Sequence, residues 1–113
     1  MTDPIHISVS SHWFQFIKDG RKTVEGRLNK GKFSSIKKGD TLVISNNKQS
    51  VIVAVISNII KYRTFEEYLV QEGLSRTLPG TRNIPDGVDI YRKFYNERME
   101  NEFGVLGIHL HKI

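Results

Sequence analysis

The stretch that most constrains the fold is Gly20–Leu28, in which charged side chains alternate along a segment that otherwise has the pattern of a β-strand. Successive side chains of a strand point to opposite faces, so Thr23, Glu25 and Arg27 are expected on one face and apolar side chains on the other. Lys22 precedes this strand, and its long side chain can bend toward the same ionic face. Two interpretations follow: an edge strand whose charges keep it soluble, or a strand that faces a ligand.

Composition favours one folded domain over residues 1–113, because 38% of the chain is hydrophobic and its length suffices for a single core. The chain has no cysteine, which excludes disulfides and thiolate metal sites and fits a reducing compartment. Its longest apolar run, residues 51–60, is too short to span a bilayer, and residues 1–10 contain no secretory hydrophobic segment. We therefore expect an intracellular, cytoplasmic protein with no membrane association.

The charge balance favours a polyanionic partner. The chain has 17 lysines and arginines against 12 acidic residues, which gives a net charge of +5. The cations concentrate in the N-terminal half, at Lys18, Arg21, Lys22, Arg27, Lys30, Lys32, Lys37 and Lys38. This half is the candidate anion-facing part, and binding through such a surface is expected to weaken steeply with salt.

Hydrophobic periodicity predicts an α+β fold, a small mixed β-barrel closed by its first and last strands and decorated with about three helices. Strands are expected at residues 5–9, 23–28, 41–45, 50–62 and 105–111, those from 23 to 62 forming an antiparallel meander. The first helix follows Ser10 or Ser11, and its Trp13 is interpreted as a core residue. Thr64 caps the second helix, and Asp86 or Asp89 opens the third.

Several common functional motifs are missing from the sequence. It contains no glycine-rich phosphate loop, dinucleotide fingerprint or nucleophile elbow. His109 and His111 have a spacing that can bind metal but lack a nearby third ligand, so we interpret them as surface residues. No metal and no cofactor is expected.

The ionic strand resembles the Gly-x-Lys-x-x-Glu-x-Arg signature of the ASCH domain, a family of the PUA-like superfamily, through Gly20, Lys22, Glu25 and Arg27. The resemblance extends over nearly the whole chain. Further matching segments are Trp13-Phe14, Lys38-Gly39-Asp40, residues 62–67, Gly73-Leu74, Leu78-Pro79-Gly80 and residues 104–108. It implies a PUA-like barrel with a cleft lined by Lys22, Glu25 and Arg27.

The first function that this resemblance implies is binding of RNA, another nucleic acid or a nucleotide in a basic cleft. In such a cleft the cations contact phosphate, Glu25 orients them or accepts from a base amine, and tyrosines stack on bases. A monomer is favoured. The expected ligand-binding residues are Lys22, Glu25, Arg27, Arg21, Tyr62 and Tyr91.

The alternative function is hydrolysis of a modified nucleoside or of RNA. One bacterial subgroup of the family removes the acetyl group of N4-acetylcytidine with a lysine, a threonine three residues later and a glutamate in the helix after the sheet. The matching positions here are Lys22, Glu25 and Glu72, so a carboxylate stands where that subgroup has a hydroxyl. If the protein is an enzyme, these three residues are the expected catalytic group.

Overall fold

The computed structural model describes residues 3–113, and Met1 and Thr2 of the expected domain lie outside the described residues. Its strands are β1 (Ile5–Ser8), β2 (Val24–Leu28), β3 (Thr41–Ser45), β4 (Val51–Tyr62) and β5 (Val105–Lys112). Its helices are α1 (Ser11–Lys18), α2 (Phe65–Glu72), α3 (Leu74–Thr77), α4 (Ile84–Arg92) and α5 (Glu97–Phe103), with a 3₁₀ helix, η1 (Gly31–Ser35). The expected α+β class is confirmed, although about three helices were predicted and the described residues form five α-helices.

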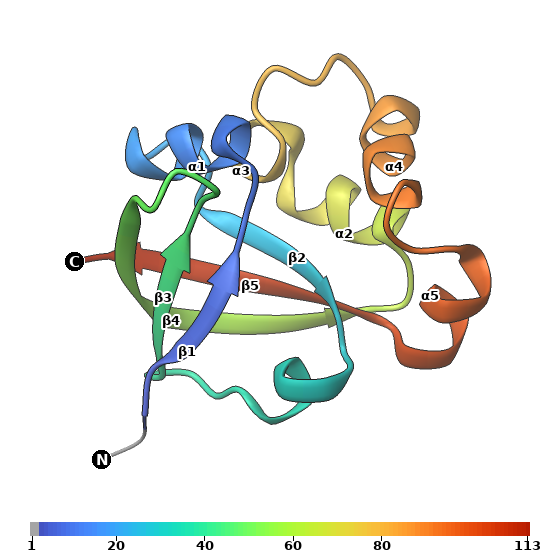
Figure 1. The fold of residues 1–113 in the computed structure, drawn as a ribbon. Coiled ribbons are helices and arrows are strands. Elements are labelled where there is room, and N and C mark those ends of the chain that lie inside the picture. Colours follow the sequence, from blue (N-terminus) through green and yellow to red (C-terminus); the bar gives the residue numbers. More distant parts are fainter. Residues whose placement is uncertain (1–2) are drawn as a thin grey trace.

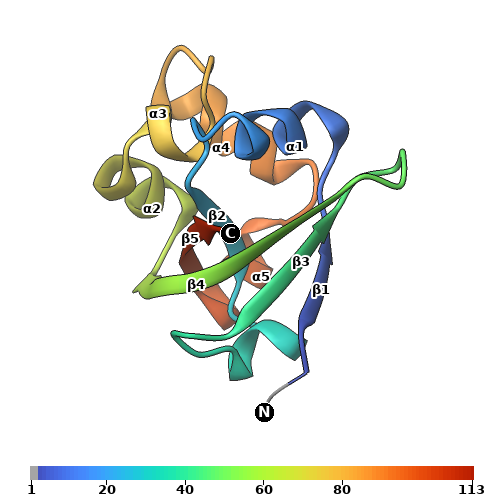
Figure 2. The same cartoon turned by 90° about the vertical axis from the view of Figure 1, so that its left-hand side faces the viewer.

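The five strands form one curled sheet in the order β1-β3-β4-β5-β2 (Figures 1 and 2). β1 pairs with β3 in parallel, and the other neighbours are antiparallel. β1 and β2 are the two edges and do not pair, so the sheet is a half-barrel with an open seam between them. Two predictions were wrong: the first and last strands do not close the barrel, and β2 pairs with β5 instead of continuing a meander into β3.

Two hydrophobic clusters make up the core. The first fills the concave side of the sheet and includes Leu42, Ile56 and Ile108. The second lies between β2, β5 and the helices α2 and α4, and includes Val24 and Phe65. β2 therefore lies between the two buried clusters. Figure 1 shows this strand passing beneath α2 and α4.

Side-chain caps fix where the helices begin. The Thr64 hydroxyl accepts from the backbone N–H of Glu67 at 3.0 Å, which confirms the predicted cap of α2. The predicted start of the third helix was wrong, because Asn83 caps α4 by accepting from the N–H of Asp86 at 2.9 Å. The side chain of Asn96 caps α5 in the same way. None of the described helices combines the length and apolar character that crossing a membrane requires.

Candidate ligand pocket at the open seam

The register of β2 decides which of its groups face the open seam. Leu110 N–H donates to the carbonyl of Thr23 at 2.9 Å, and Asn29 N–H donates to the carbonyl of Gly104 at 3.0 Å. In an antiparallel ladder, hydrogen-bonded residues alternate with residues whose peptide groups point outward. The odd-numbered residues of β2 therefore bond to β5, and the N–H and carbonyl of Gly26 point away from β5 toward the seam.

The ammonium group of Lys22 is fully enclosed and has three acceptors. Lys22 is 2% exposed, and its Nζ donates to the carbonyl oxygens of Val24 at 2.9 Å and of Thr77 at 2.5 Å. The third partner is Oε1 of Glu25, at 3.2 Å. Thr77 ends α3, and a helix C-terminus favours a cation. Lys22 therefore ties the start of β2 to α3.

Glu25 and Arg27 share the concave face of β2, as the alternation predicted. Arg27 Nε donates to Glu25 Oε2 at 2.7 Å, and Nη2 donates to the carbonyl of Ser8 at 2.7 Å. Lys32 Nζ likewise donates to the carbonyl of His6. Cationic side chains thus bond to the free edge of β1, where strand-to-strand hydrogen bonds would otherwise close the sheet.

The electrostatic environment keeps Glu25 ionised. Burial by itself raises the pKa of Glu25, but the adjacent charges of Lys22 and Arg27 outweigh burial and leave this pKa below its usual value. Burial lowers the pKa of the Lys22 ammonium, and Glu25 opposes that change. Burial also acts to lower the pKa of Arg27, but the carboxylate of Glu25 outweighs it and raises this pKa. The site holds one carboxylate between two cationic side chains.

A cavity of about 380 Å³ lies along this ionic cluster, between the end of β1, β2 and α4. One wall is polar and consists of Lys22, Glu25, Gly26 and Arg27. The aromatic residues that line the cavity are Trp13, Tyr91, Phe94 and Tyr95, and the ring centroid of Trp13 lies 5.8 Å from Lys22 Nζ. The expected cleft is therefore present, but aromatic and aliphatic side chains make up much of its lining.

The aromatic lining is held in place by packing within the second core cluster. The ring of Phe65 stacks on Tyr91 with centroids 4.3 Å apart and on Tyr95 with centroids 5.5 Å apart. Burial raises the pKa of Tyr91, so its hydroxyl stays neutral, and it donates to the hydroxyl of Tyr68 at 3.4 Å. Trp13, expected in the core, packs against this cluster and also lines the pocket.

Three of the expected site residues do not line the pocket. Arg21 is exposed and its guanidinium lies over the ring of Phe16, 4.4 Å from the centroid. Tyr62 donates its hydroxyl to Oε2 of Glu72 at 2.6 Å, and both residues belong to a separate cluster. Of the expected residues, the pocket brings together Lys22, Glu25, Arg27 and Tyr91.

The cluster around Glu72 includes a histidine whose role was mispredicted. His109 Nε2 lies 2.9 Å from Glu72 Oε2, and the His109 side chain is only 22% exposed, so it is not a free surface residue. Glu72 itself is 6% exposed. Its partners on β4 and β5 tie α2 to the sheet.

Few of the clustered N-terminal cations reach the pocket. Lys22 and Arg27 are the two that line it. Lys32 bonds to β1, and Lys30 lies over the ring of Phe103 at 5.1 Å. Proximity along the chain therefore did not translate into a continuous basic cleft.

Several pocket residues were not identified from the sequence. Ser8 lines the pocket, and its backbone carbonyl accepts from Arg27, as the Thr77 carbonyl outside the pocket accepts from Lys22; such backbone contacts leave no trace in the residue type. Phe94 and Tyr95 follow α4 and were not among the expected site residues. The signal that could have found them is the presence of three aromatic residues among the five positions from 91 to 95.

The family model of the ASCH domain matches residues 7–113. The crystal structure of the hypothetical protein PH0355 is 33% identical, covers 98% of this chain and 100% of its own, and has a TM-score of 0.91. The solution structure of protein PF0455 from Pyrococcus furiosus is 32% identical, covers 98% of both chains, and has a TM-score of 0.80.

A variant of ZmASCH from Zymomonas mobilis shares the fold, with a TM-score of 0.57 and 17% identity over 94% of this chain and 66% of its own. No curated protein matches the chain.

Proposed function

The chain belongs to the ASCH domain family, and from this premise we propose that it binds RNA, or a nucleotide, by holding one base in the pocket between β1, β2 and α4. The observation that carries the proposal is that buried ionic side chains and aromatic side chains line the same cavity. Proteins that recognise single-stranded RNA stack its bases on aromatic rings and hydrogen-bond their edges.

The size of the pocket fits a ligand of this kind. Its volume of about 380 Å³ lies near the lower end of the range of about 300 to 1,000 Å³ typical of small-molecule sites. A planar ring with part of its sugar suits this space better than a folded oligonucleotide. The rest of a strand would lie outside, along the mouth.

The polar wall offers donors and acceptors for the edge of a base. Arg27 donates from Nε to Glu25 and from Nη2 to the carbonyl of Ser8. Within residues 3–113, its third nitrogen, Nη1, has no hydrogen-bond partner. The seam-facing N–H and carbonyl of Gly26 form an adjacent donor and acceptor. Glu25 retains acceptor capacity for an amino group, since a carboxylate has about four lone-pair sites.

Titration against RNA tests the proposal, and Trp13 provides the readout because it is the only tryptophan in the chain and lines the pocket. The probes are the four nucleoside 5′-monophosphates and four single-stranded RNAs, each made of five copies of one nucleotide. Wild type should show saturable quenching with at least one of them. Arg27→Ala should weaken that binding by about tenfold or more, which matches the loss of a charge-assisted hydrogen bond.

The matched control is Arg63→Ala, because the side chain of Arg63 is 92% exposed and remote from this pocket. It should change affinity by less than about twofold. Circular dichroism checks that both variants are folded. An absence of wild-type quenching, or equal effects of the two substitutions, would reject the pocket as the binding site.

A second candidate is a hydrolase acting on N4-acetylcytidine or RNA. The observation in its favour is the Lys22 ammonium, which burial gives a lowered pKa, as expected of a catalytic amine. Against it, all three protons of this ammonium have acceptors and Glu72 lies in another cluster.

The test is product formation from N4-acetylcytidine and from RNA by wild type and Lys22→Ala. Turnover lost in the variant supports the hydrolase, whereas no turnover by wild type rejects it.

A further inference from the structure

The mouth of the pocket carries an aromatic ring that folding leaves mostly in solvent. Phe94 is 70% exposed. Among residues 3–113, every other phenylalanine, tyrosine and tryptophan is buried or partly buried. Scattered exposed apolar side chains are common in proteins and need no explanation by themselves. What distinguishes Phe94 is that this exposed ring also lines the cavity.

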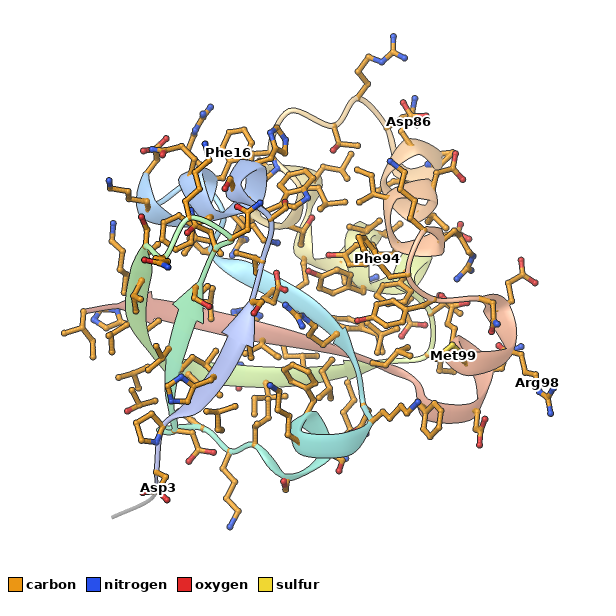
Figure 3. All side chains as sticks on the ribbon, in the orientation of Figure 1. Asp3, Phe16, Asp86, Phe94, Arg98 and Met99 are labelled. Atoms are coloured by element: carbon orange, nitrogen blue, oxygen red, sulfur yellow. The ribbon has the colours of Figure 1, made fainter. Side chains whose placement is uncertain are left out.

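The ring of Phe94 is presented from a fixed piece of backbone. The N–H groups of Phe94 and Tyr95 both donate to the carbonyl of Tyr91, at 3.0 and 2.9 Å, which continues the last turn of α4. The Phe94 and Tyr95 rings lie with centroids 6.3 Å apart at an interplanar angle of 56°. Figure 3 shows Phe94 just below α4, on the side of this helix that faces β2. The two rings therefore form neighbouring but differently oriented surfaces at one opening.

We propose that Phe94 stacks on the base that neighbours the one held in the pocket, so that the recognised ligand is a single strand of at least two nucleotides and not a free nucleoside. This inference rests on the proposed function. The partly buried Tyr95 faces the pocketed base, and the exposed Phe94 faces the next base along the strand. Lys93, which is exposed beside Phe94, supplies a cation for the phosphate between the two bases.

Stacking gives the size of the expected effect. Removing one base–aromatic contact by alanine substitution lowers affinity by about 5- to 150-fold. A mononucleotide has no second base, so loss of the Phe94 ring should weaken a tetranucleotide more than the matching mononucleotide. This difference between the two ligands separates a second stacking position from a general effect on the pocket.

The experiment compares wild type with Phe94→Ala, Phe94→Tyr and Val70→Ala. Val70 on α2 is an exposed apolar residue, 56% accessible, that does not line the pocket. The probes are a nucleoside 5′-monophosphate and the matching tetranucleotide for each of the four bases, followed by Trp13 fluorescence. Thermal melting confirms that the variants are folded.

We expect Phe94→Ala to weaken tetranucleotide binding at least about fivefold more than mononucleotide binding. Phe94→Tyr should retain wild-type discrimination, because the ring is kept, and Val70→Ala should behave as wild type. Equal losses for both ligands, or no loss for either, would overturn the inference while leaving the proposed function standing. If wild type binds neither probe, the proposed function fails and this inference fails with it.

Discussion

The ammonium group of Lys22 has as many acceptors around it as it has protons, and this saturation shapes its role. Two acceptors are backbone carbonyls and the third is Glu25. A cation in this position orients the carboxylate of Glu25, which in turn orients Arg27. Arg27 is then the member of the group with a donor left for a ligand.

Replacing Lys22 with methionine tests this structural role. Lys22→Met keeps much of the side-chain volume but leaves two buried carbonyls without a donor and Glu25 with Arg27 as its remaining cationic partner. Removing one partner of a buried ion pair costs about 3–5 kcal/mol, so we expect a loss of this size in the free energy of unfolding. Urea denaturation measures it, with the exposed Lys38→Met as the control. A loss below about 1 kcal/mol would mean that the ammonium contributes little.

The double variant Lys22→Met/Glu25→Gln provides a second check. Because it also removes the carboxylate that Lys22 helps to neutralise, its loss should be smaller than the sum of the two single losses. Additive losses would show that the two side chains act independently.

Glu25 should make stability depend on pH in the acidic range. Its pKa in the folded protein lies below the ordinary value, which is about 4.3 for a glutamate in an unfolded chain. The unfolded chain therefore binds this proton first as the pH falls. The contribution of Glu25 is complete above the unfolded pKa and is lost as the pH falls through the folded pKa.

The free energy of unfolding of wild type minus that of Glu25→Gln should accordingly shrink progressively as the pH falls below the ordinary pKa of a glutamate. Urea denaturation at several pH values gives this difference, in which the other acidic groups largely cancel. An NMR titration of the glutamate carboxyl carbons checks the pKa in the wild-type protein. A difference that stays constant with pH would contradict the assigned pKa shift.

Sequence alternation identified which charges would meet, but not every partner. Glu25 and Arg27 could be grouped because two-residue periodicity places their side chains on one face whatever the fold, and Lys22 could be added because its long side chain can bend to that face. Glu72 lies with Tyr62 and His109 instead, because the direction of its side chain depends on how α2 sits against β4 and β5. Such packing is set by tertiary contacts that local patterns do not encode.

At the level of elements, the seam between β1 and β2 is what creates the site. Each strand was predictable from its own alternation, with close boundaries. Their pairing was not, since periodicity says nothing about which strand lies next to which. The four-residue helix α3 was also not foreseen, although it supplies the Thr77 carbonyl to Lys22.

The junction of α2, α4 and α5 depends on one buried carboxylate, that of Glu100. Its Oε2 accepts from the N–H of Phe65 at 2.7 Å, and its Oε1 accepts from Nη2 of Arg92 at 2.9 Å. The Arg92 Nη1 atom is already buried without a partner among the described residues. Glu100 therefore satisfies the first turn of α2 and balances the charge of Arg92.

We expect Glu100→Ala to lower the free energy of unfolding by about 2–4 kcal/mol, because it leaves a helix N–H and a partly buried guanidinium without their acceptor. The control is Glu97→Ala on the exposed side of the same helix, which should cost less than about 0.5 kcal/mol. Chemical denaturation of both variants gives the comparison. Similar losses would show that the contacts of Glu100 are not what stabilises the junction.

Over the whole molecule, if the protein binds RNA as proposed, the net charge of +5 and the pocket make separable contributions to that binding. Between residues 18 and 38, Lys22 and Arg27 are the cations that line the pocket, and Lys22 is saturated by its internal partners. If binding takes place in the pocket, the proposal places two cations of the described residues against the strand, Arg27 at the base and Lys93 at the phosphate, so about two counterions at most are released. The steep salt dependence expected from charge clustering is therefore revised to a shallow one.

For single strands the slope of log K against log salt concentration is about −0.7 for each neutralised phosphate, so two contacts predict a slope of about −1 to −2. Engagement of all eight N-terminal cations would instead give a slope near about −5 to −6. Fluorescence titration of a five-nucleotide RNA between about 50 and 300 mM salt distinguishes the two cases, since the affinity change differs by orders of magnitude. The variant Lys37→Ala/Lys38→Ala should leave a shallow slope unchanged. A steep slope that this variant reduces would place the RNA on the cationic surface outside the pocket.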